Sequence, residues 1–197
     1  MIEVALIVSA YLLGSVPSGY LLGRLTGVDV RKAGSGNVGA TNVARVLGKG
    51  QGVLTLMADA AKGWLPVYAA LAIDPSLLVA ILAGAAAFLG HLYPIFLRFE
   101  GGKGVATAVG VLLSLAPIVA MVLCGIFAVT VAASRVVSLG SMAAAVAAPF
   151  ALWIAGYPPM VVATGGFMAA MITWRHRGNI RRLLAGTEPR FGTSNSR

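Results

Sequence analysis

Residues 105–133 read VATAVGVLLSLAPIVAMVLCGIFAVTVAA, and the number of times this stretch crosses a membrane decides the fold. A membrane-spanning helix needs about 20 apolar residues, so this run is long for one helix and short for two. Ser114 and Pro117 lie near its middle. Proline removes a backbone donor and disfavours helix at the preceding residue. We therefore expect a turn at 114–117 that joins two half-length helices in a tight hairpin at about 105–133.

The chain as a whole is also strongly apolar. Hydrophobic residues make up 58% of the 197 residues and charged residues only 11%, too few to cover the surface of a soluble domain of this size. The N-terminal run carries Glu3 instead of a basic segment, so we interpret it as a membrane helix and not as a signal peptide. Further apolar runs lie at about 2–23, 52–73, 77–97, 136–156 and 159–174. The chain is therefore predicted to be an all-α integral membrane protein.

The basic residues predict the topology, because cytoplasmic loops of membrane proteins are enriched in Lys and Arg. With a hairpin at 105–133, the chain has seven transmembrane helices, its N-terminus outside and its C-terminus in the cytoplasm. Fourteen of the fifteen basic residues then lie inside: Arg24, Arg31, Lys32, Arg45, Lys49, Arg98, Lys103, Arg135, Arg175, Arg177, Arg181, Arg182, Arg190 and Arg197. Six spans would place Arg135 and the C-terminal cluster outside, so seven spans fit better.

The same charges argue against a nucleic acid partner, although the net charge is +9. Topology and lipid headgroups account for the basic residues, and no binding module accompanies them. We predict one domain over 1–197, with a mobile polar tail at 186–197. Cys124 lies in an apolar run and is interpreted as a small apolar filler.

The first inside loop contains AGSGNVGATN at 33–42. Thr41 or Asn42 could cap a short helix at 43–47 that Gly48 would end, with Arg45 on the same face as Thr41. Three of the loop's glycines match G-x-G-x-x-G, but a membrane helix precedes them, whereas a dinucleotide-binding site needs a strand there. We therefore expect the glycines of this loop to leave space for a different anionic ligand.

The second inside loop reads EGGKG at 100–104, and a helix follows at once. Glycine amides, a helix N-terminus and Lys103 together form a typical phosphate-binding arrangement. The alternative is a tight glycine turn with a lysine that reaches toward the membrane surface. The motif is not a Walker loop, because Leu97 and Gly104 stand where that loop needs glycine and Ser or Thr.

Further polar residues lie at membrane boundaries or within a span. Ser138 could cap the helix after the third inside turn, and Ser141 follows one turn later. His176 and Asn179 are three residues apart, so they share a helix face. Asp59 and Lys62, also three apart, lie within a predicted span, where charges are either paired or functional. The sequence leaves open which of these two roles they have.

Two other chemistries are not indicated by the sequence. Neither histidine has a carboxylate four or five residues downstream, so the histidine–aspartate box of acyl-CoA-dependent glycerolipid acyltransferases is absent. No group of His, Cys and carboxylates has the spacing of a metal site. We predict neither a metal nor a cofactor.

Five blocks of the sequence together resemble the bacterial acyl-phosphate:glycerol-3-phosphate acyltransferase family. They are GSVPSGYLLGR (14–24), GSGNVGATNVAR (34–45), GHLYPIFLRFEGGKGVAT (90–107), RVVSLGS (135–141) and RHRGNIRRLLAGTE (175–188). The resemblance implies a seven-span inner-membrane enzyme with its active site facing the cytoplasm. It would transfer a fatty acyl group from acyl phosphate to the 1-hydroxyl of sn-glycerol 3-phosphate, which gives lysophosphatidic acid and phosphate and begins phospholipid synthesis.

The resemblance also implies roles for individual residues. The catalytic candidates are Ser35, Arg45, His176 and Asn179. The candidates for substrate binding are Gly36, Asn37, Thr41, Asn42, Gly101, Gly102, Lys103, Gly104, Ser138 and Ser141. Glu188 is interpreted as structural, and Asp59 and Lys62 remain candidates without an assigned role.

Acyl phosphate is already activated, so positioning and charge stabilisation would supply much of the catalysis. We expect direct attack by the glycerol hydroxyl without an acyl-enzyme, with either His176 or the leaving phosphate as proton acceptor. The expected partners are the two substrates, the lipid bilayer and, as a further candidate, the soluble enzyme that makes acyl phosphate. The alternative function is transport of a small anion such as phosphate, for which glycine loops and Lys62 would also be suitable.

Overall fold

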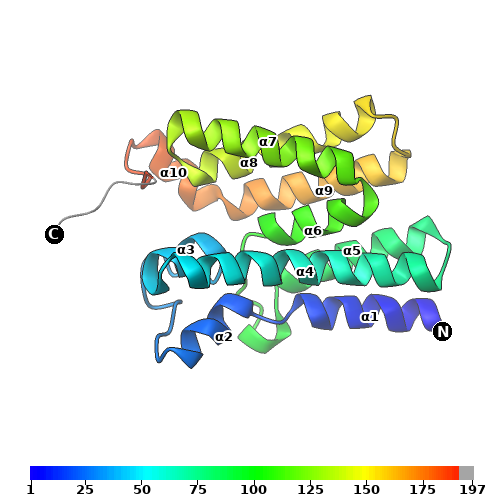
Figure 1. Ribbon diagram of the computed structural model, residues 1–197, viewed down its shortest axis with the longest axis horizontal. Coiled ribbons are helices and arrows are strands. Elements are labelled where there is room, and N and C mark those ends of the chain that lie inside the picture. The colour runs from blue at the N-terminus through cyan, green and yellow to red at the C-terminus, as the bar shows by residue number, and fades with distance from the viewer. Residues whose placement is uncertain (191–197) are drawn as a thin grey trace. The chain divides into compact units, whose positions relative to one another are not determined.

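The computed structural model describes residues 1–190, and every regular element in this range is a helix (Figure 1). The chain divides into two compact units, Met1–Leu115 and Ala116–Arg197. Unit 1 contains α1 (Ile2–Gly14), α2 (Ser18–Leu25), α3 (Ala40–Leu47), α4 (Lys49–Ile73), α5 (Leu77–Leu92), the short 3-10 helix η1 (Ile95–Leu97) and α6 (Val105–Leu115). Unit 2 contains α7 (Pro117–Ser134), α8 (Val137–Ile154), α9 (Pro159–Arg175) and α10 (Arg177–Leu184).

Unit 1 is assembled around α4, which packs against α3, α5 and α6, while α1 packs along α5. Small residues let these helices approach closely, as is common in membrane proteins. A Cβ atom added at Gly110 of α6 would overlap the carbonyl of Ala60 on α4, and one added at Gly14 of α1 would overlap Ala87 on α5. Glycine is therefore required at these two helix crossings.

The N-terminal apolar run at 2–23 is not the single helix that its length predicted. It breaks after Gly14, and α1 and α2 meet at an angle of 42°. Pro17 follows the break, has no N–H to donate, and disfavours helix at Val16. The break leaves the Val16 carbonyl available to a side chain of α4, as the next section describes.

The predicted interruption in 105–133 is confirmed, but the two pieces are unequal. Helix α6 ends at Leu115 and α7 begins at Pro117, with Ala116 in a non-helical conformation between them. Helix α6 has 11 residues and α7 has 18. At a rise of about 1.5 Å per residue, α6 is roughly half the length that a bilayer requires, whereas α7 is long enough. Two half-length helices were the wrong expectation.

In unit 2, α8 packs against both α7 and α9. Helix α7 ends at Ser134, and its C-cap Arg135 adopts the left-handed conformation with φ of 60°. Helix α9 is followed almost directly by α10, with His176 at the junction. Two of the polar motifs predicted from the sequence thus lie in unit 2, at the α7–α8 turn and at the α9–α10 junction.

Among the described residues, three helical segments are long and apolar enough to cross a membrane: Leu77–Leu97, Pro117–Ser134 and Val137–Ile154. The bent pair α1 and α2 would make a fourth span if it crosses as one. The all-helical class is therefore confirmed, while seven spans and their orientation stay predictions. The single domain also stays a prediction. Residues 191–197 of the predicted tail lie outside the described residues.

Candidate functional site

The first loop of unit 1 is held together by Asn42. Its side-chain nitrogen donates to the carbonyls of Val30, Ala33 and Asn37 at 2.8–3.1 Å, and its oxygen accepts from the Ser35 amide at 2.7 Å. Helix α3 begins at Ala40, so neither Thr41 nor Asn42 is its N-cap. That prediction was wrong because the helix starts earlier, with Gly39 as its N-cap. Gly48 does end α3, as predicted.

The side chains predicted to act from this loop lie on its surface. Ser35, Gly36, Thr41 and Arg45 are exposed, whereas Asn42 is buried. Gly36 has φ of 72°, a conformation that side chains other than glycine rarely adopt. The loop is therefore a preformed and solvent-accessible surface whose shape depends on Asn42.

Asp29, at the start of the same loop, pairs with Arg31. Two hydrogen bonds of 2.8–2.9 Å join the Arg31 guanidinium to its carboxylate. They lower the pKa of Asp29 to about 2, although partial burial opposes the shift. The Arg31 guanidinium also lies 4.5 Å from the centre of the Tyr20 ring. Arg31 is therefore committed to contacts within the protein.

The EGGKG loop uses its glycines differently from the prediction. The amides of Gly101 and Gly102 donate to the carbonyls of Leu92 and His91, at 3.2 and 3.1 Å. A Cβ atom on Gly102 would overlap the imidazole of His91, so glycine is needed here for close approach. These two amides thus bond to the end of α5, and the half-buried Lys103 follows them.

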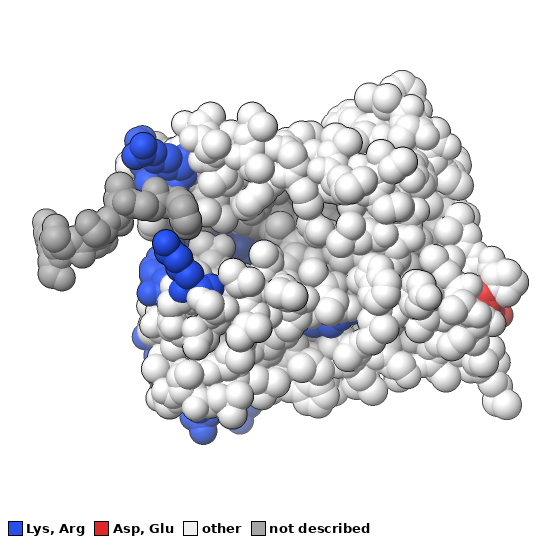
Figure 2. All heavy atoms as spheres, in the orientation of Figure 1, with Lys and Arg blue, Asp and Glu red and all other residues white. Residues whose placement is uncertain are grey.

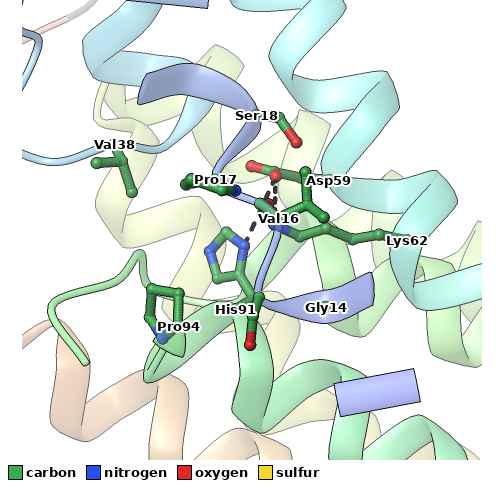
Figure 3. A pocket seen from close by; sticks show the side chains of 10 residues that line it. Gly14, Val16, Pro17, Ser18, Val38, Asp59, Lys62, His91 and Pro94 are labelled. Atoms are coloured by element: carbon green, nitrogen blue, oxygen red, sulfur yellow. Dashed lines mark hydrogen bonds and ion pairs between the residues drawn. The ribbon is translucent and has the colours of Figure 1, made fainter. Parts of the chain in front are cut away.

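Beneath this loop lies a buried charged cluster formed by Asp59, Lys62 and His91 (Figure 3). The Lys62 ammonium lies 2.9 Å from the Asp59 carboxylate, which confirms that the two are paired. Lys62 also donates to the Val16 carbonyl at the α1–α2 break, at 2.7 Å. His91 Nδ1 lies 3.6 Å from the same Asp59 oxygen. All three side chains are at most 6% exposed.

A small cavity of about 10 Å³ borders the cluster. Its lining comes from the α1–α2 break, the first loop, α4 and α5: Gly14, Ser15, Val16, Pro17, Ser18, Val38, Asp59, Lys62, His91 and Pro94. A cavity of this size holds about one water molecule. The cluster thus connects the two predicted ligand-binding loops, since Val38 belongs to the first loop and His91 contacts the second.

In unit 2, a second polar cluster is centred on Glu188. Its carboxylate accepts hydrogen bonds from Ser138 at 2.6 Å, from Asn179 at 2.5 Å and from Arg182 at 2.7 Å. Burial raises the pKa of Glu188, but these three hydrogen bonds outweigh it and hold the pKa below its usual value. Ser138 therefore bonds to a distant carboxylate, and the prediction that it caps α8 was wrong.

His176 lies near this cluster in sequence and is 2% exposed. Its Nδ1 donates to the Ile172 carbonyl at 2.8 Å, which makes Nε2 the nitrogen with the lone pair in the neutral ring. His176 lies at the α9–α10 junction and Asn179 within α10, where it is also buried. Ser141 is buried too, and its hydroxyl donates to the Val137 carbonyl at 3.0 Å.

Sequence reasoning missed two features of the candidate site. One is the contact of His91 with Asp59, and the other is that three side chains bond to Glu188. The sequence around His91 lacks the carboxylate of a histidine–aspartate box, and Glu188 is predicted only to be structural. No group of three or more metal-binding side chains occurs within residues 1–190.

Comparison with known proteins gives a match over nearly the whole chain. The family model described as glycerol-3-phosphate acyltransferase matches residues 4–186. The glycerol-3-phosphate acyltransferase of Geobacter metallireducens is 53% identical over 192 residues, which cover 97% of this chain and 98% of the relative. That of Geotalea daltonii is 47% identical over 190 residues, covering 96% and 97%.

Solved structures agree with these relatives. A crystal structure of PlsY (YgiH), an integral membrane glycerol 3-phosphate acyltransferase in its glycerol 3-phosphate form, has a TM-score of 0.94 and 45% identity. The match covers 98% of this chain and 97% of that one. The lysophosphatidic acid form has a TM-score of 0.91 and 44% identity.

Proposed function

This chain belongs to the glycerol-3-phosphate acyltransferase family, and we propose that it transfers a fatty acyl group from acyl phosphate to the 1-hydroxyl of sn-glycerol 3-phosphate. The products are lysophosphatidic acid and phosphate, in the first acylation step of bacterial phospholipid synthesis. The observation that carries this proposal is the match at 53% identity over 97% of the chain. The PlsY structures, in glycerol 3-phosphate and lysophosphatidic acid forms, provide support for the acceptor and the product.

We further propose that the protein spans the bacterial inner membrane seven times, with the N-terminus outside and the active site facing the cytoplasm. Figure 2 shows basic side chains over the end of unit 1 that carries α2 and α3. In unit 2, the basic residues up to 190 lie at the α7–α8 turn, around the α9–α10 junction and after α10. Such clustering is typical of the cytoplasmic ends of membrane helices.

In unit 1, the proposed role is to bind the phosphate groups of the two substrates. Lys103 supplies a full positive charge next to the N-terminus of α6, where the helix dipole also favours an anion. Arg45, with Ser35, Gly36, Asn37 and Thr41, would bind the other phosphate on the first loop. Asn42 acts indirectly in this proposal, because its side chain is occupied in holding that loop.

In unit 2, we propose that His176, Asn179, Ser138 and Ser141 orient substrate oxygens or accept the proton. The glycerol hydroxyl oxygen forms a bond to the acyl carbon while the bond from that carbon to the phosphate oxygen breaks. The hydroxyl proton goes either to His176 Nε2 or to the departing phosphate, and no acyl-enzyme forms. The orientation of the His176 ring supports the first route, since Nδ1 already donates to Ile172.

The test of the function is an assay with purified protein in lipid vesicles, supplied with acyl phosphate and labelled glycerol 3-phosphate. Lysophosphatidic acid and inorganic phosphate should appear in equal amounts. Release of phosphate without lysophosphatidic acid would disprove acyl transfer, and activity with acyl-CoA in place of acyl phosphate would disprove the donor. Uptake of phosphate into sealed vesicles without any chemistry would favour the transporter. Addition of the soluble enzyme that makes acyl phosphate tests that candidate partner.

The proton acceptor is tested with His176→Ala. If His176 is the base, kcat should fall about 100-fold or more, since general bases contribute roughly 10²–10⁴-fold. Near-normal turnover would assign the proton to the leaving phosphate. Labelled acyl groups that stay attached to the protein after denaturation would disprove direct attack.

A further inference from the structure

The segment that leads into the EGGKG loop has a strained backbone. Arg98 and Phe99 are both left-handed, with φ of 52° and 66°, and Gly104 has φ of 85°. For residues other than glycine, this conformation is sterically unfavourable. Two such residues in succession persist only where the surrounding structure holds them. The loop that presents Lys103 therefore depends on contacts outside itself.

Those contacts come from the end of α5, and His91 supplies several of them. Its carbonyl accepts the Gly102 amide at 3.1 Å, and its ring lies so close to Gly102 that a methyl group there would overlap Nε2. A Cβ atom on Gly101 would likewise overlap the His91 carbonyl. Lys103 is the next residue, so a shift of His91 would shift the backbone that carries this lysine.

The His91 ring itself faces the buried Asp59–Lys62 pair. Its Nδ1 faces the carboxylate of Asp59, which pairs with Lys62, and Lys62 donates to the Val16 carbonyl at the α1–α2 break (Figure 3). These contacts join α1, α4 and α5 at one buried point. The contacts extend from the Val16 carbonyl at the α1–α2 break to Gly102 in the EGGKG loop.

The three side chains do not bind a substrate phosphate directly. The adjoining cavity of about 10 Å³ accommodates about one water molecule, whereas a phosphate group is several times larger. Because the three side chains are at most 6% exposed, the cluster can affect substrate binding only through the EGGKG loop that it contacts.

We propose that Asp59, Lys62 and His91 are positioning residues that hold the Gly101–Gly104 loop, and with it Lys103, in the geometry that binds a substrate phosphate. This role rests on the proposed acyl transfer, because it assigns a phosphate to that loop. It gives the Asp59–Lys62 pair a purpose beyond neutralising charge inside the membrane.

The first test is His91→Ala, which leaves the Asp59–Lys62 pair intact. Amide hydrogen exchange in a peptide spanning residues 98–106 should become about tenfold faster or more, because the ring that lies against Gly102 is lost while only the backbone hydrogen bonds to α5 remain. In the acyl transfer assay, KM for one of the two substrates should rise about tenfold to a hundredfold with a smaller change in kcat, as expected for a misplaced binding group. The substrate affected identifies which phosphate the loop binds.

His91→Asn separates the two contacts of the ring. The asparagine amide keeps a polar group facing Asp59 but lacks the imidazole edge that lies against Gly102. Both the exchange rate and KM should lie between those of the natural protein and His91→Ala. The double variant Asp59→Asn/Lys62→Met removes both charges without leaving one unpaired, and it should loosen the loop as His91→Ala does.

The matched control is Thr55→Val. Thr55 is a fully buried polar residue one turn before Asp59 on α4, and its hydroxyl donates to the Gln51 carbonyl of its own helix. Exchange at 98–106 and both KM values should stay within about twofold in this variant, as is usual for changes distant from a site.

Unchanged exchange at 98–106 in His91→Ala would overturn the proposal. So would a fall in kcat with both KM values unchanged, because that pattern indicates a smaller folded fraction and no displaced loop. The exchange measurement needs no substrate. If the natural protein failed to transfer acyl groups, the proposed function would fail, while the exchange data would still decide whether the cluster holds the loop.

Discussion

The two units each contain a polar cluster centred on one carboxylate, but the clusters are built differently. In unit 1, Asp59 lies among helices α1, α4 and α5, and its partners Lys62 and His91 are buried with it. In unit 2, Glu188 lies after α10 and joins that segment to α8 through Ser138. Its partner Arg182 is 43% exposed.

This difference determines what each carboxylate can stabilise. The Asp59 cluster is formed by helix packing, so a charge that loses its partner there stays buried. The Glu188 carboxylate is itself only 7% exposed, but its partner Arg182 lies partly at the surface, where water can replace it. We therefore expect changes in the first cluster to affect the whole of unit 1, and changes in the second to affect the segment around α10.

The largest effect is expected for Asp59→Ala. This change leaves the Lys62 ammonium buried with the Val16 carbonyl but without its carboxylate, and breaking such a pair from one side costs about 3–5 kcal/mol. Thermal unfolding of the purified protein in detergent should show a large decrease in Tm.

The double variant Asp59→Ala/Lys62→Met provides the control. With both charges gone, no uncompensated ion remains, so the double variant should be more stable than Asp59→Ala alone. If the single and double variants had the same Tm, the two charges would not be coupled, and unit 1 would not depend on their pairing.

A smaller effect is expected for Glu188→Gln. The neutral amide cannot pair with Arg182 and accepts more weakly from Ser138 and Asn179. Hydrogen bonds to charged groups contribute about 1.5–3 kcal/mol each at most, so the segment 177–188 should exchange its amides faster while unit 1 is unaffected. Arg182→Gln is the matched change, and it should cost less than about 1 kcal/mol because that ion pair is partly exposed. Equal effects of the two changes would contradict a cluster centred on Glu188.

The stability that Glu188 provides should also depend on pH. Because folding lowers its pKa, the folded state favours the charged form, and the contribution is complete above the unfolded pKa of about 4.3. It is lost as pH falls from there through the lower folded pKa. The difference in stability between the natural protein and Glu188→Gln should thus be constant from pH 7 to about 5 and shrink below about 4. A difference that grew on acidification would mean that folding raises the pKa.

The sequence predicted a helix boundary well where a proline divides an unusually long apolar run. Pro117 marked the end of α6 because apolar residues on both sides left room for two helices. The same rule applies at Pro17, but the apolar run there has an ordinary length for one span, so nothing in its length indicated the break. The unequal lengths of α6 and α7 could not be predicted either, since apolar residues flank Pro117 without a polar boundary.

The site was predictable only for residues close in sequence. Asp59 and Lys62 are three residues apart on a helix, and that spacing alone indicates a pair. His91 lies on another helix and reaches Asp59 only because α4 packs against α5. Glu188 bonds to Ser138, 50 residues earlier in the sequence, and this contact likewise depends on how the helices pack. Asn42 was predicted as a cap or a ligand, but its role in holding the loop depends on three carbonyls whose directions the sequence does not specify.

The smallest effect is expected at a buried polar group outside both clusters. Thr107 on α6 is fully buried, and its hydroxyl has no hydrogen-bond partner among the described residues. An unsatisfied buried hydroxyl costs stability, so Thr107→Val, which keeps the shape, should leave Tm unchanged or raise it by the equivalent of about 1 kcal/mol. Thr55→Val removes a hydroxyl that is bonded, so it should lower Tm slightly. If Thr107→Val were the more damaging of the two, its hydroxyl would have a partner, such as a water molecule, and burial in unit 1 would require satisfied polar groups outside the charged cluster as well.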